Sequence, residues 1–266
     1  MFKDIKQVMK DSVLYGIGNV AVKLVGFILI PLYTDAEYFS TADYGLMGLL
    51  EVTSQILIAV MGLSLYSGLI RWYWDAEYRD KQKTIFFTTL LFTILTSLCI
   101  GSVLWLNVGE LSALLVQQEG YSLGGELPYI LQLLILTSML GAVVEVPQNL
   151  LRLQRKPIYY SLTNIVRLFV TLVLTIYFTI SLHRGVSGVY EAQLVGIVIQ
   201  LLMVLPLVIK NSSCRVDRKC TIQLLVYSYP LVFPAIVGSL LTVFDRYIIN
   251  HFQGLDDVGF YSLGYK

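Results

Sequence analysis

Long apolar segments alternate with short charged gaps along this chain, and the sign of the charge changes from one gap to the next. The predicted apolar segments are residues 12–33, 44–70, 84–106, 127–150, 158–181, 189–209 and 223–248. Each is long enough to cross about 30 Å of hydrocarbon as a helix. Helix is also the form in which one segment satisfies its own backbone hydrogen bonds in lipid. The sequence therefore predicts an all-α fold, a polytopic transmembrane helix bundle.

Basic residues concentrate in the N-terminal tail and in every second gap. They are Lys3, Lys6, Lys10, Arg71, Arg79, Lys81, Lys83, Arg152, Arg155, Lys156, Lys210, Arg215, Arg218 and Lys219. The remaining gaps are acidic, and Arg184 is the only base in them. Because Lys and Arg in short loops stay in the cytoplasm, this alternation predicts a multi-pass membrane protein whose N-terminus lies in the cytoplasm.

The composition and the absence of soluble-site motifs argue against an enzyme. Charged residues make up 14% of the chain and apolar residues 56%, whereas a soluble domain carries about 25% charged residues. There is no phosphate-binding Walker loop and no His-Glu-x-x-His motif, and Gly16-x-Gly18 lacks the third glycine of a dinucleotide site. No His and Cys residues stand at metal-ligand spacing. We expect no catalytic set, no resident cofactor, no metal and no nucleic-acid partner.

An internal repeat predicts how the chain is organised. Sliding the sequence by about 214 positions aligns the first span with the seventh, and the matched pairs are Tyr15/Tyr229, Ala21/Ala235, Tyr33/Tyr247, Asp43/Asp257, Gly45/Gly259 and Leu49/Leu263. Six helices followed by a restart form a parallel repeat, as in transporters built from two lobes. We therefore predict a six-helix lobe at 1–209, a cytoplasmic linker at 210–222, and the first helix of a second lobe with the start of the next at 223–266, where the chain looks truncated.

Two cations fall within the predicted spans, where charge is costly unless it faces a cavity or a partner. Lys23 lies near the middle of the first span and shares a helix face with Asn19, four residues earlier. Arg167 lies in the fifth span and is one turn from Asn164. These four residues are the candidate substrate-binding residues.

Two acids also fall within spans, Glu51 in the second and Glu145 in the fourth. Both are candidate ion-coupling residues, for H+ or Na+. A structural alternative stays open, in which Lys23 pairs with Glu51 and Arg167 pairs with Glu145 simply to neutralise buried charge.

Three further charges are assigned to a gate. Asp245 and Arg246 lie at the outer end of the seventh span, and Arg71 lies at the end of the second. We expect Asp245 and Arg246 to contact the first lobe from the periplasmic side. The alternative is that they anchor the helix at the membrane interface.

Two stretches resemble a known family. One is Ile30-Pro31-Leu32-Tyr33-Thr34 followed by Ser40-Thr41-Ala42-Asp43-Tyr44-Gly45, and the other runs from Phe244-Asp245-Arg246-Tyr247 through Gly254-Leu255-Asp256-Asp257-Val258-Gly259. They are similar to the end of the first helix and the exit of the seventh in Wzx-like polysaccharide flippases of the MATE/MOP superfamily. The resemblance implies a protein of 12 to 14 helices, of which this chain supplies the N-terminal lobe and the entry to the second.

The resemblance implies a function as well. It implies a flippase for polyprenyl-pyrophosphate-linked oligosaccharide that works by alternating access, contacts membrane lipids and cooperates with polysaccharide polymerase or ligase machinery. A drug or metabolite antiporter of the same superfamily is the first alternative, although Lys23 and Arg167 argue against cationic substrates. A membrane-embedded glycosyltransferase or polymerase is the second. It would need a large outer loop, and the longest outer gap, 107–126, is short.

Overall fold

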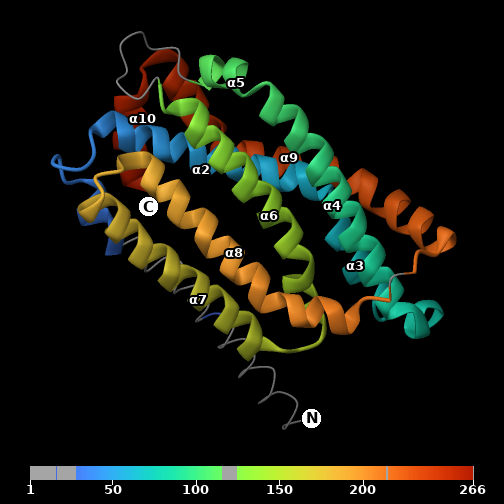
Figure 1. Cartoon of the computed structure of the whole chain (residues 1–266). Coiled ribbons are helices and arrows are strands. Elements are labelled where there is room, and N and C mark those ends of the chain that lie inside the picture. The colour runs from blue at the N-terminus through green and yellow to red at the C-terminus, as the bar shows by residue number, and fades with distance from the viewer. Residues whose placement is uncertain (1–15, 17–27, 116–124, 214, 266) are drawn as a thin grey trace.

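The computed structural model describes residues 16, 28–115, 125–213 and 215–265, and within them the chain folds into helices without strands (Figure 1). The elements are α2 (Thr41–Gly62), α3 (Leu65–Trp72), the 3-10 turn η1 (Ala76–Lys81), α4 (Gln82–Leu106), α5 (Val108–Leu115), α6 (Leu127–Leu153), α7 (Pro157–Ile176), the π-helical turn η2 (Tyr177–Ser181), α8 (Gly185–Asn211), α9 (Arg218–Phe252) and α10 (Leu255–Tyr265). Six of the described helices are long and apolar enough to cross a membrane. The predicted all-α bundle is therefore confirmed, while most of the predicted first span lies outside the described residues.

The gaps predicted to be basic meet at one end of the bundle, which we call the basic end. Lys81 Nζ lies 2.5 Å from Asp217 Oδ2 and so joins the second gap to the sixth. Gln154, in the fourth gap, donates from Nε2 to Asn211 at 2.8 Å and to the Tyr73 hydroxyl at 3.1 Å. The hydrogen bond from Lys81 is the main reason why the pKa of Asp217 is lowered. Three gaps that are far apart in sequence thus share one surface.

The acidic gaps meet at the opposite end, the acidic end. The ring of Tyr38 stacks on that of His183 with 6.4 Å between centroids. Asn250 donates to the Leu115 carbonyl oxygen at 2.9 Å, which joins the end of α9 to the short helix α5. The alternation of charge along the sequence therefore becomes a separation of charge between the two ends of the structure.

The second span is broken, so the prediction of one continuous helix over 44–70 is wrong. α2 ends at Gly62 and α3 begins at Leu65. Between them Leu63 and Ser64 have φ angles of 44° and 50°, the left-handed region that residues with a side chain rarely adopt. The Ser64 hydroxyl donates to the Leu231 carbonyl oxygen in α9 at 3.3 Å. A contact between distant segments therefore helps to hold the break.

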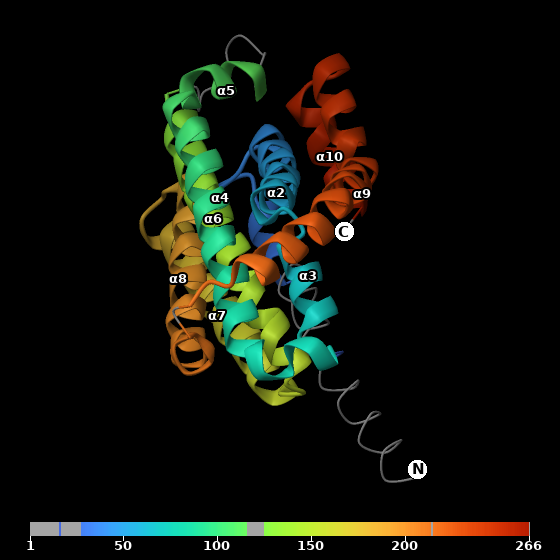
Figure 2. The same cartoon turned by 90° about the vertical axis from the view of Figure 1, so that its right-hand side faces the viewer.

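The aligned repeats meet where α2 crosses α10 (Figure 2). A Cβ added to Gly45 would lie 1.9 Å from the Leu255 carbonyl oxygen, and one added to Gly259 would lie 2.5 Å from the Thr41 carbonyl oxygen. Gly45 and Gly259 are matched positions of the repeat, and so are Thr41 and Leu255. The crossing is therefore reciprocal, as at an interface with two-fold symmetry. The absence of side chains at the two glycines is what lets the helices approach so closely.

Helix α9 lies along one side of the bundle (Figure 2). It contacts α2, α3, α4 and α10, and it contains Pro230 and Pro234, which each remove a backbone hydrogen bond. Many of its apolar side chains face outward, as shown by Leu241, which is 81% exposed. The main core lies elsewhere, where α6 packs on α2 and on α8 through fully buried side chains such as Leu49 and Leu134.

Candidate functional site

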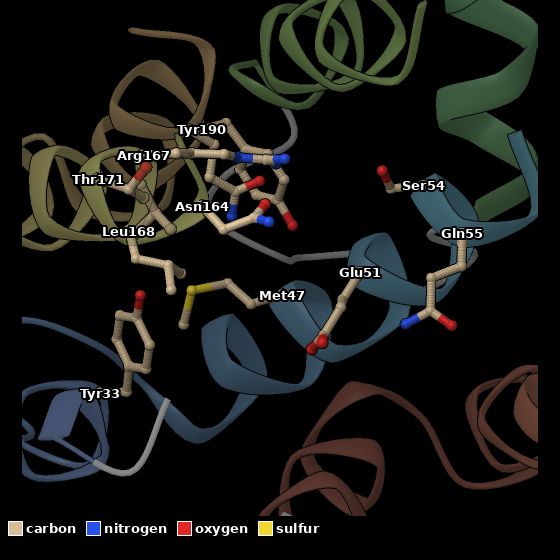
Figure 3. A pocket seen from close by; sticks show the side chains of 12 residues that line it. Tyr33, Met47, Glu51, Ser54, Gln55, Asn164, Arg167, Leu168, Thr171 and Tyr190 are labelled. Carbon is tan, nitrogen blue, oxygen red and sulfur yellow. The ribbon is translucent and has the colours of Figure 1, made fainter. Parts of the chain in front are cut away.

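A polar cavity of about 400 Å³ opens between α2, α7 and α8, and we call it the arginine cavity. Figure 3 shows Arg167 and Asn164 on one wall and Glu51 and Gln55 on α2 across from them. The residues that line it are Tyr33, Met47, Glu51, Ser54, Gln55, Asn164, Arg167, Leu168, Thr171, Val189, Tyr190 and Gln193. Three of the residues predicted from sequence, Asn164, Arg167 and Glu51, are thus brought together.

Arg167 is held by the side-chain amide of Gln200, and no described carboxylate pairs with it. Its guanidinium donates to Gln200 Oε1 at 3.1 Å, and Gln200 Nε2 donates to Asn164 Oδ1 at 2.9 Å. Asn164 in turn donates to the Tyr160 carbonyl oxygen at 3.0 Å. Gln200 is the single described hydrogen-bond partner of Arg167, although a guanidinium carries five N–H donors. Most of its donors therefore remain available to an anionic ligand.

The sequences of α7 and α8 explain this local geometry. Asn164, Arg167 and Thr171 follow one another at helical spacing and share one face of α7. On α8, Gly196 lets the two helices approach, since a Cβ there would lie 2.2 Å from Thr171 Oγ1 and 3.3 Å from the Arg167 carbonyl oxygen. Gln200 lies one turn beyond Gly196 and so reaches the Arg167 side chain.

The α2 wall supplies an acid and a neutral amide. Glu51 and Gln55 are one turn apart, and both side chains are exposed to the cavity. No described residue forms an ion pair with Glu51. Tyr33, Tyr190 and Gln193 add hydroxyl and amide groups to the lining. The cavity combines one cation, one acid and a larger number of neutral hydrogen-bonding groups.

Glu145 lies in a different cavity from Arg167. It lines a space beside the α2–α3 break together with residues of α9. Arg167 and Glu145 therefore do not form the charge-neutralising ion pair that was the alternative to a substrate site. Arg167 donates to Gln200 instead. The other proposed pair, Lys23 with Glu51, cannot be placed, since Lys23 and Asn19 lie outside the described residues.

The three predicted gate residues are not together. Arg71 is near the basic end, where its guanidinium lies 3.7 Å from Asp75 and 4.8 Å from the centre of the Trp72 ring. Asp245 accepts a hydrogen bond from the Tyr261 hydroxyl.

Arg246 is buried and lies 5.3 Å from the centre of the Tyr265 ring. The hydrogen bond of Asp245 and the ring contact of Arg246 are thus both with α10. A gate role stays a prediction for all three residues.

Two polar residues on α8 were missed, Gln193, which lines the arginine cavity, and Gln200, which accepts the hydrogen bond from Arg167. Gln193 and Gln200 lie seven residues apart in an otherwise apolar segment, and this spacing puts them on one helix face. That pair of amides in a predicted span was a usable signal. Tyr190 carried no such signal, because aromatic residues are common near the ends of membrane helices.

The sequence matches the model of one protein family over nearly its whole length. The family is described as polysaccharide biosynthesis protein, and the match covers residues 8–266. This chain belongs to that family. A search of curated proteins returns no significant match.

Several solved transporters share the fold of this family member. A MATE protein in a straight conformation superposes with a TM-score of 0.72 at 16% identity, over 92% of this chain and 55% of that one. A multidrug resistance MATE transporter of the MOP superfamily in an outward-facing conformation gives 0.70 at 16% identity, over 98% of this chain and 59% of the other.

A MOP transporter from Pyrococcus furiosus, described as having a binding pocket of reverse polarity, gives a TM-score of 0.69 at 16% identity, over 92% of this chain and 55% of its own. The chain therefore has the fold of MOP-superfamily membrane transporters and spans under two thirds of the length of those transporters.

Proposed function

We propose that this protein takes part in flipping a polyprenyl-pyrophosphate-linked oligosaccharide across the bacterial cytoplasmic membrane. The observation that carries the proposal is Arg167, a cation that no described carboxylate pairs with and whose free donors line a polar cavity inside a bundle of membrane helices. Membership of the polysaccharide biosynthesis family supports this choice of substrate class.

The chemistry of the arginine cavity suits the two parts of such a head group. A pyrophosphate loses its hydration on entering a low-dielectric region, and that loss must be replaced by charge and hydrogen bonds. A guanidinium can bind phosphate oxygens with two parallel hydrogen bonds. Neutral groups such as Asn164, Gln193 and Ser54 suit sugar hydroxyls, which both donate and accept. Lys23 remains a second candidate contact on the evidence of sequence alone.

Transport would proceed by alternating access between two lobes. The reciprocal α2–α10 crossing is what two parallel repeats would form at their shared axis. The lipid tail would stay in the bilayer between the lobes, and the basic end would face the cytoplasm. Polysaccharide polymerase or ligase machinery would be the partner. Glu51 and Glu145 would bind the coupling ion.

The proposal is tested by a translocation assay for lipid-linked oligosaccharide in cells that express the protein. We expect Arg167→Gln to lower transport at least tenfold at normal protein level, because a hydrogen bond to a charged group contributes about 1.5–3 kcal/mol. Arg167→Lys should keep part of the activity if charge alone matters. Arg215→Gln is the matched control, since Arg215 is exposed at the basic end. Unchanged transport in Arg167→Gln would reject the proposal.

A cation antiporter is the second candidate, and Glu51 is the observation that favours it. This exposed carboxylate lines the same cavity as Arg167 and has no described ion-pair partner. For an antiporter we expect Glu51→Gln to abolish efflux of a cationic substrate and Arg167→Gln to leave it intact. The flippase predicts the stronger effect at Arg167.

A further inference from the structure

A separate cavity, of about 650 Å³, lies at the basic end, between the residues just beyond α3 and the turn that joins α6 to α7, and we call it the basic cavity. The residues that line it are Tyr73, Trp74, Leu153, Gln154, Arg155 and Lys156. Two of these side chains are cations and none is an acid. The arginine cavity, by contrast, holds an acid as well as a cation. The lining of the basic cavity therefore carries a net positive charge.

No described carboxylate neutralises the two cations of the basic cavity. Arg155 and Lys156 are exposed, and neither forms an ion pair with a described residue. Lys156 Nζ donates to Gln154 Oε1 at 2.7 Å, which uses one of its three donors. The nearest acid in sequence to the aromatic wall is Asp75, and it lies 3.7 Å from the guanidinium of Arg71. The positive charge of the basic cavity is thus available to an anion.

Hydrogen bonds hold the polar wall of the basic cavity in place. Gln154 Nε2 donates to the Tyr73 hydroxyl at 3.1 Å and to Asn211 at 2.8 Å. Tyr73 is only 4% exposed, and its hydroxyl hydrogen has no acceptor among the described residues. A phenol that accepts one hydrogen bond can still donate its own hydrogen to an oxyanion. The wall therefore offers a buried neutral donor beside the two exposed cations.

The start of α7 adds to this electrostatic preference. The N-terminal end of a helix carries about half a positive charge, and Lys156 is the N-cap residue of α7, with no described side chain capping that end. Arg155 in addition has a φ of 51°, a conformation that glycine adopts more easily. Helix electrostatics and backbone geometry thus both disfavour basic residues at these positions. A bound anion removes the electrostatic part of that cost.

An apolar stripe runs from the basic cavity along α7, which lies at the edge of the bundle (Figure 1). Ile158, Leu162, Ile165 and Phe169 follow one another at helical spacing, and each is between 40% and 67% exposed. At 100° per residue they lie on the face of α7 opposite to Arg167. Ile158 and Phe169 are about 16 Å apart at 1.5 Å per residue, and the hydrocarbon of one leaflet is about 15 Å thick. The stripe therefore fits an acyl chain outside the bundle, away from the arginine cavity.

We propose that the basic cavity binds the head group of an anionic phospholipid, held as a resident lipid on the outside of the bundle. Arg155, Lys156 and the Tyr73 hydroxyl would bind the phosphate oxygens. Trp74, which is 65% exposed, would lie at the level of the head groups, where Trp residues concentrate in membrane proteins. Basic pockets between membrane helices bind anionic head groups in this way. The inference requires a membrane protein and does not depend on the proposed flippase function.

The test is titration of the purified, delipidated protein in neutral detergent with phosphatidylglycerol, with bound lipid counted by native mass spectrometry. We expect saturable binding whose affinity falls at least tenfold in the double variant Arg155→Gln, Lys156→Gln, because each basic side chain contributes several-fold to binding of an anionic lipid. Phosphatidylcholine with the same acyl chains should bind several-fold more weakly to the original protein, since its head group has no net charge.

The matched control is the double variant Lys83→Gln, Arg215→Gln. It removes one lysine and one arginine from exposed positions in the basic gaps but outside the basic cavity, so the net charge changes equally. This variant should bind phosphatidylglycerol within twofold of the original protein. An equal loss in both double variants would show attraction by net charge alone and overturns the site.

Tyr73→Phe keeps the proposal testable if the first double variant does not fold, which size-exclusion elution and melting temperature show. It removes one hydroxyl without changing the charge, and it should weaken phosphatidylglycerol binding several-fold. Phosphatidylcholine that binds as tightly as phosphatidylglycerol overturns the head-group site. Inorganic phosphate that competes at the same concentration would assign the cavity to a free anion. A polyprenyl pyrophosphate that binds there more tightly would assign it to the transported lipid, and either result overturns the resident phospholipid.

Discussion

Gly45→Ala is the smallest change that tests whether the α2–α10 crossing opens and closes. The added Cβ would lie 1.9 Å from the Leu255 carbonyl oxygen and 2.9 Å from the Gly259 nitrogen. Both neighbours are backbone atoms, so no side chain can rotate away. Since ordinary contact begins at 3.4 Å, the two helices must separate locally by about 1.5 Å. We therefore expect the crossing, and whatever state of the protein depends on it, to be destabilised.

The expected size follows from the cost of overpacking. Adding a methyl group where the surroundings cannot yield costs about 1–3 kcal/mol. Each 1.4 kcal/mol is a factor of about ten in an equilibrium. If the crossing belongs to one state of a two-state transporter, Gly45→Ala should lower the ratio of closed to open crossings about 5- to 150-fold.

A disulfide between α2 and α10 reports on the crossing. A Cβ on Gly48 would lie 3.1 Å from the Ser262 Cβ. The Cβ–Cβ separation in a disulfide is about 3.8 Å, so the two positions are near enough to be bridged. The double variant Gly48→Cys with Ser262→Cys should therefore cross-link under mild oxidation. The native cysteines are first replaced by serine. Gly45→Ala should slow cross-linking, while Gly109→Ala, at a glycine on α5 with no atom near the added Cβ, should not. If cross-linking proceeds at the same rate with Gly45→Ala as with Gly109→Ala, α2 and α10 are not held as close together as the structure has them.

Two further predictions concern orientation and stability. Single cysteines at positions 122 and 213, in place of Ser122 and Ser213 and in a background without native cysteines, should react with a membrane-impermeant reagent from opposite sides. Ser122→Cys should be labelled from the periplasm, and labelling of both from one side would refute the assigned topology. Arg155→Gly should raise the melting temperature by the equivalent of about 1 kcal/mol, because Arg155 adopts a left-handed conformation with a φ of 51°, which glycine adopts without strain. This position ends α6, and the two hydrogen bonds that close the helix end, from Arg155 N–H to the Arg152 carbonyl and from Lys156 N–H to the Leu151 carbonyl, are both formed. An unchanged or lower melting temperature would show that the Arg155 side chain contributes more than its backbone conformation costs.

The positions of several helices along the chain were predictable because lipid imposes a strict requirement on the backbone. The predicted spans 84–106, 127–150 and 189–209 lie within α4, α6 and α8, and each of these helices extends only a few residues further. The polar stripe of α7 was also predictable, since Asn164 and Arg167 are one turn apart whatever the tertiary structure. Periodicity within one helix is sufficient for such statements. It does not say which other helix a stripe faces.

Features that depend on contacts between helices were not predictable in this way. The hydrogen bond from Gln200 to Asn164 joins residues 36 positions apart and depends on how α7 packs on α8. Arg167 and Glu145 were both plausible partners by depth in the membrane, yet they line different cavities because α6 and α7 present them in different directions. Depth follows from counting residues along a span. Direction around the helix axis follows from packing.

The break in the second span shows why a backbone feature can escape a sequence argument. Gly62 is a local signal for a helix end, but Leu63 and Ser64, the two residues that adopt the left-handed conformation, are not residues that favour it. The left-handed pair is held by groups far away, since Ser64 donates to Leu231 of α9 and the Thr96 hydroxyl of α4 donates to the Met61 carbonyl oxygen at 2.7 Å. Strain of this kind persists only where surrounding structure maintains it. The conformation of Leu63 and Ser64 is therefore set by packing of α2 and α3 against α4 and α9, and such contacts between distant segments are not visible in the local sequence.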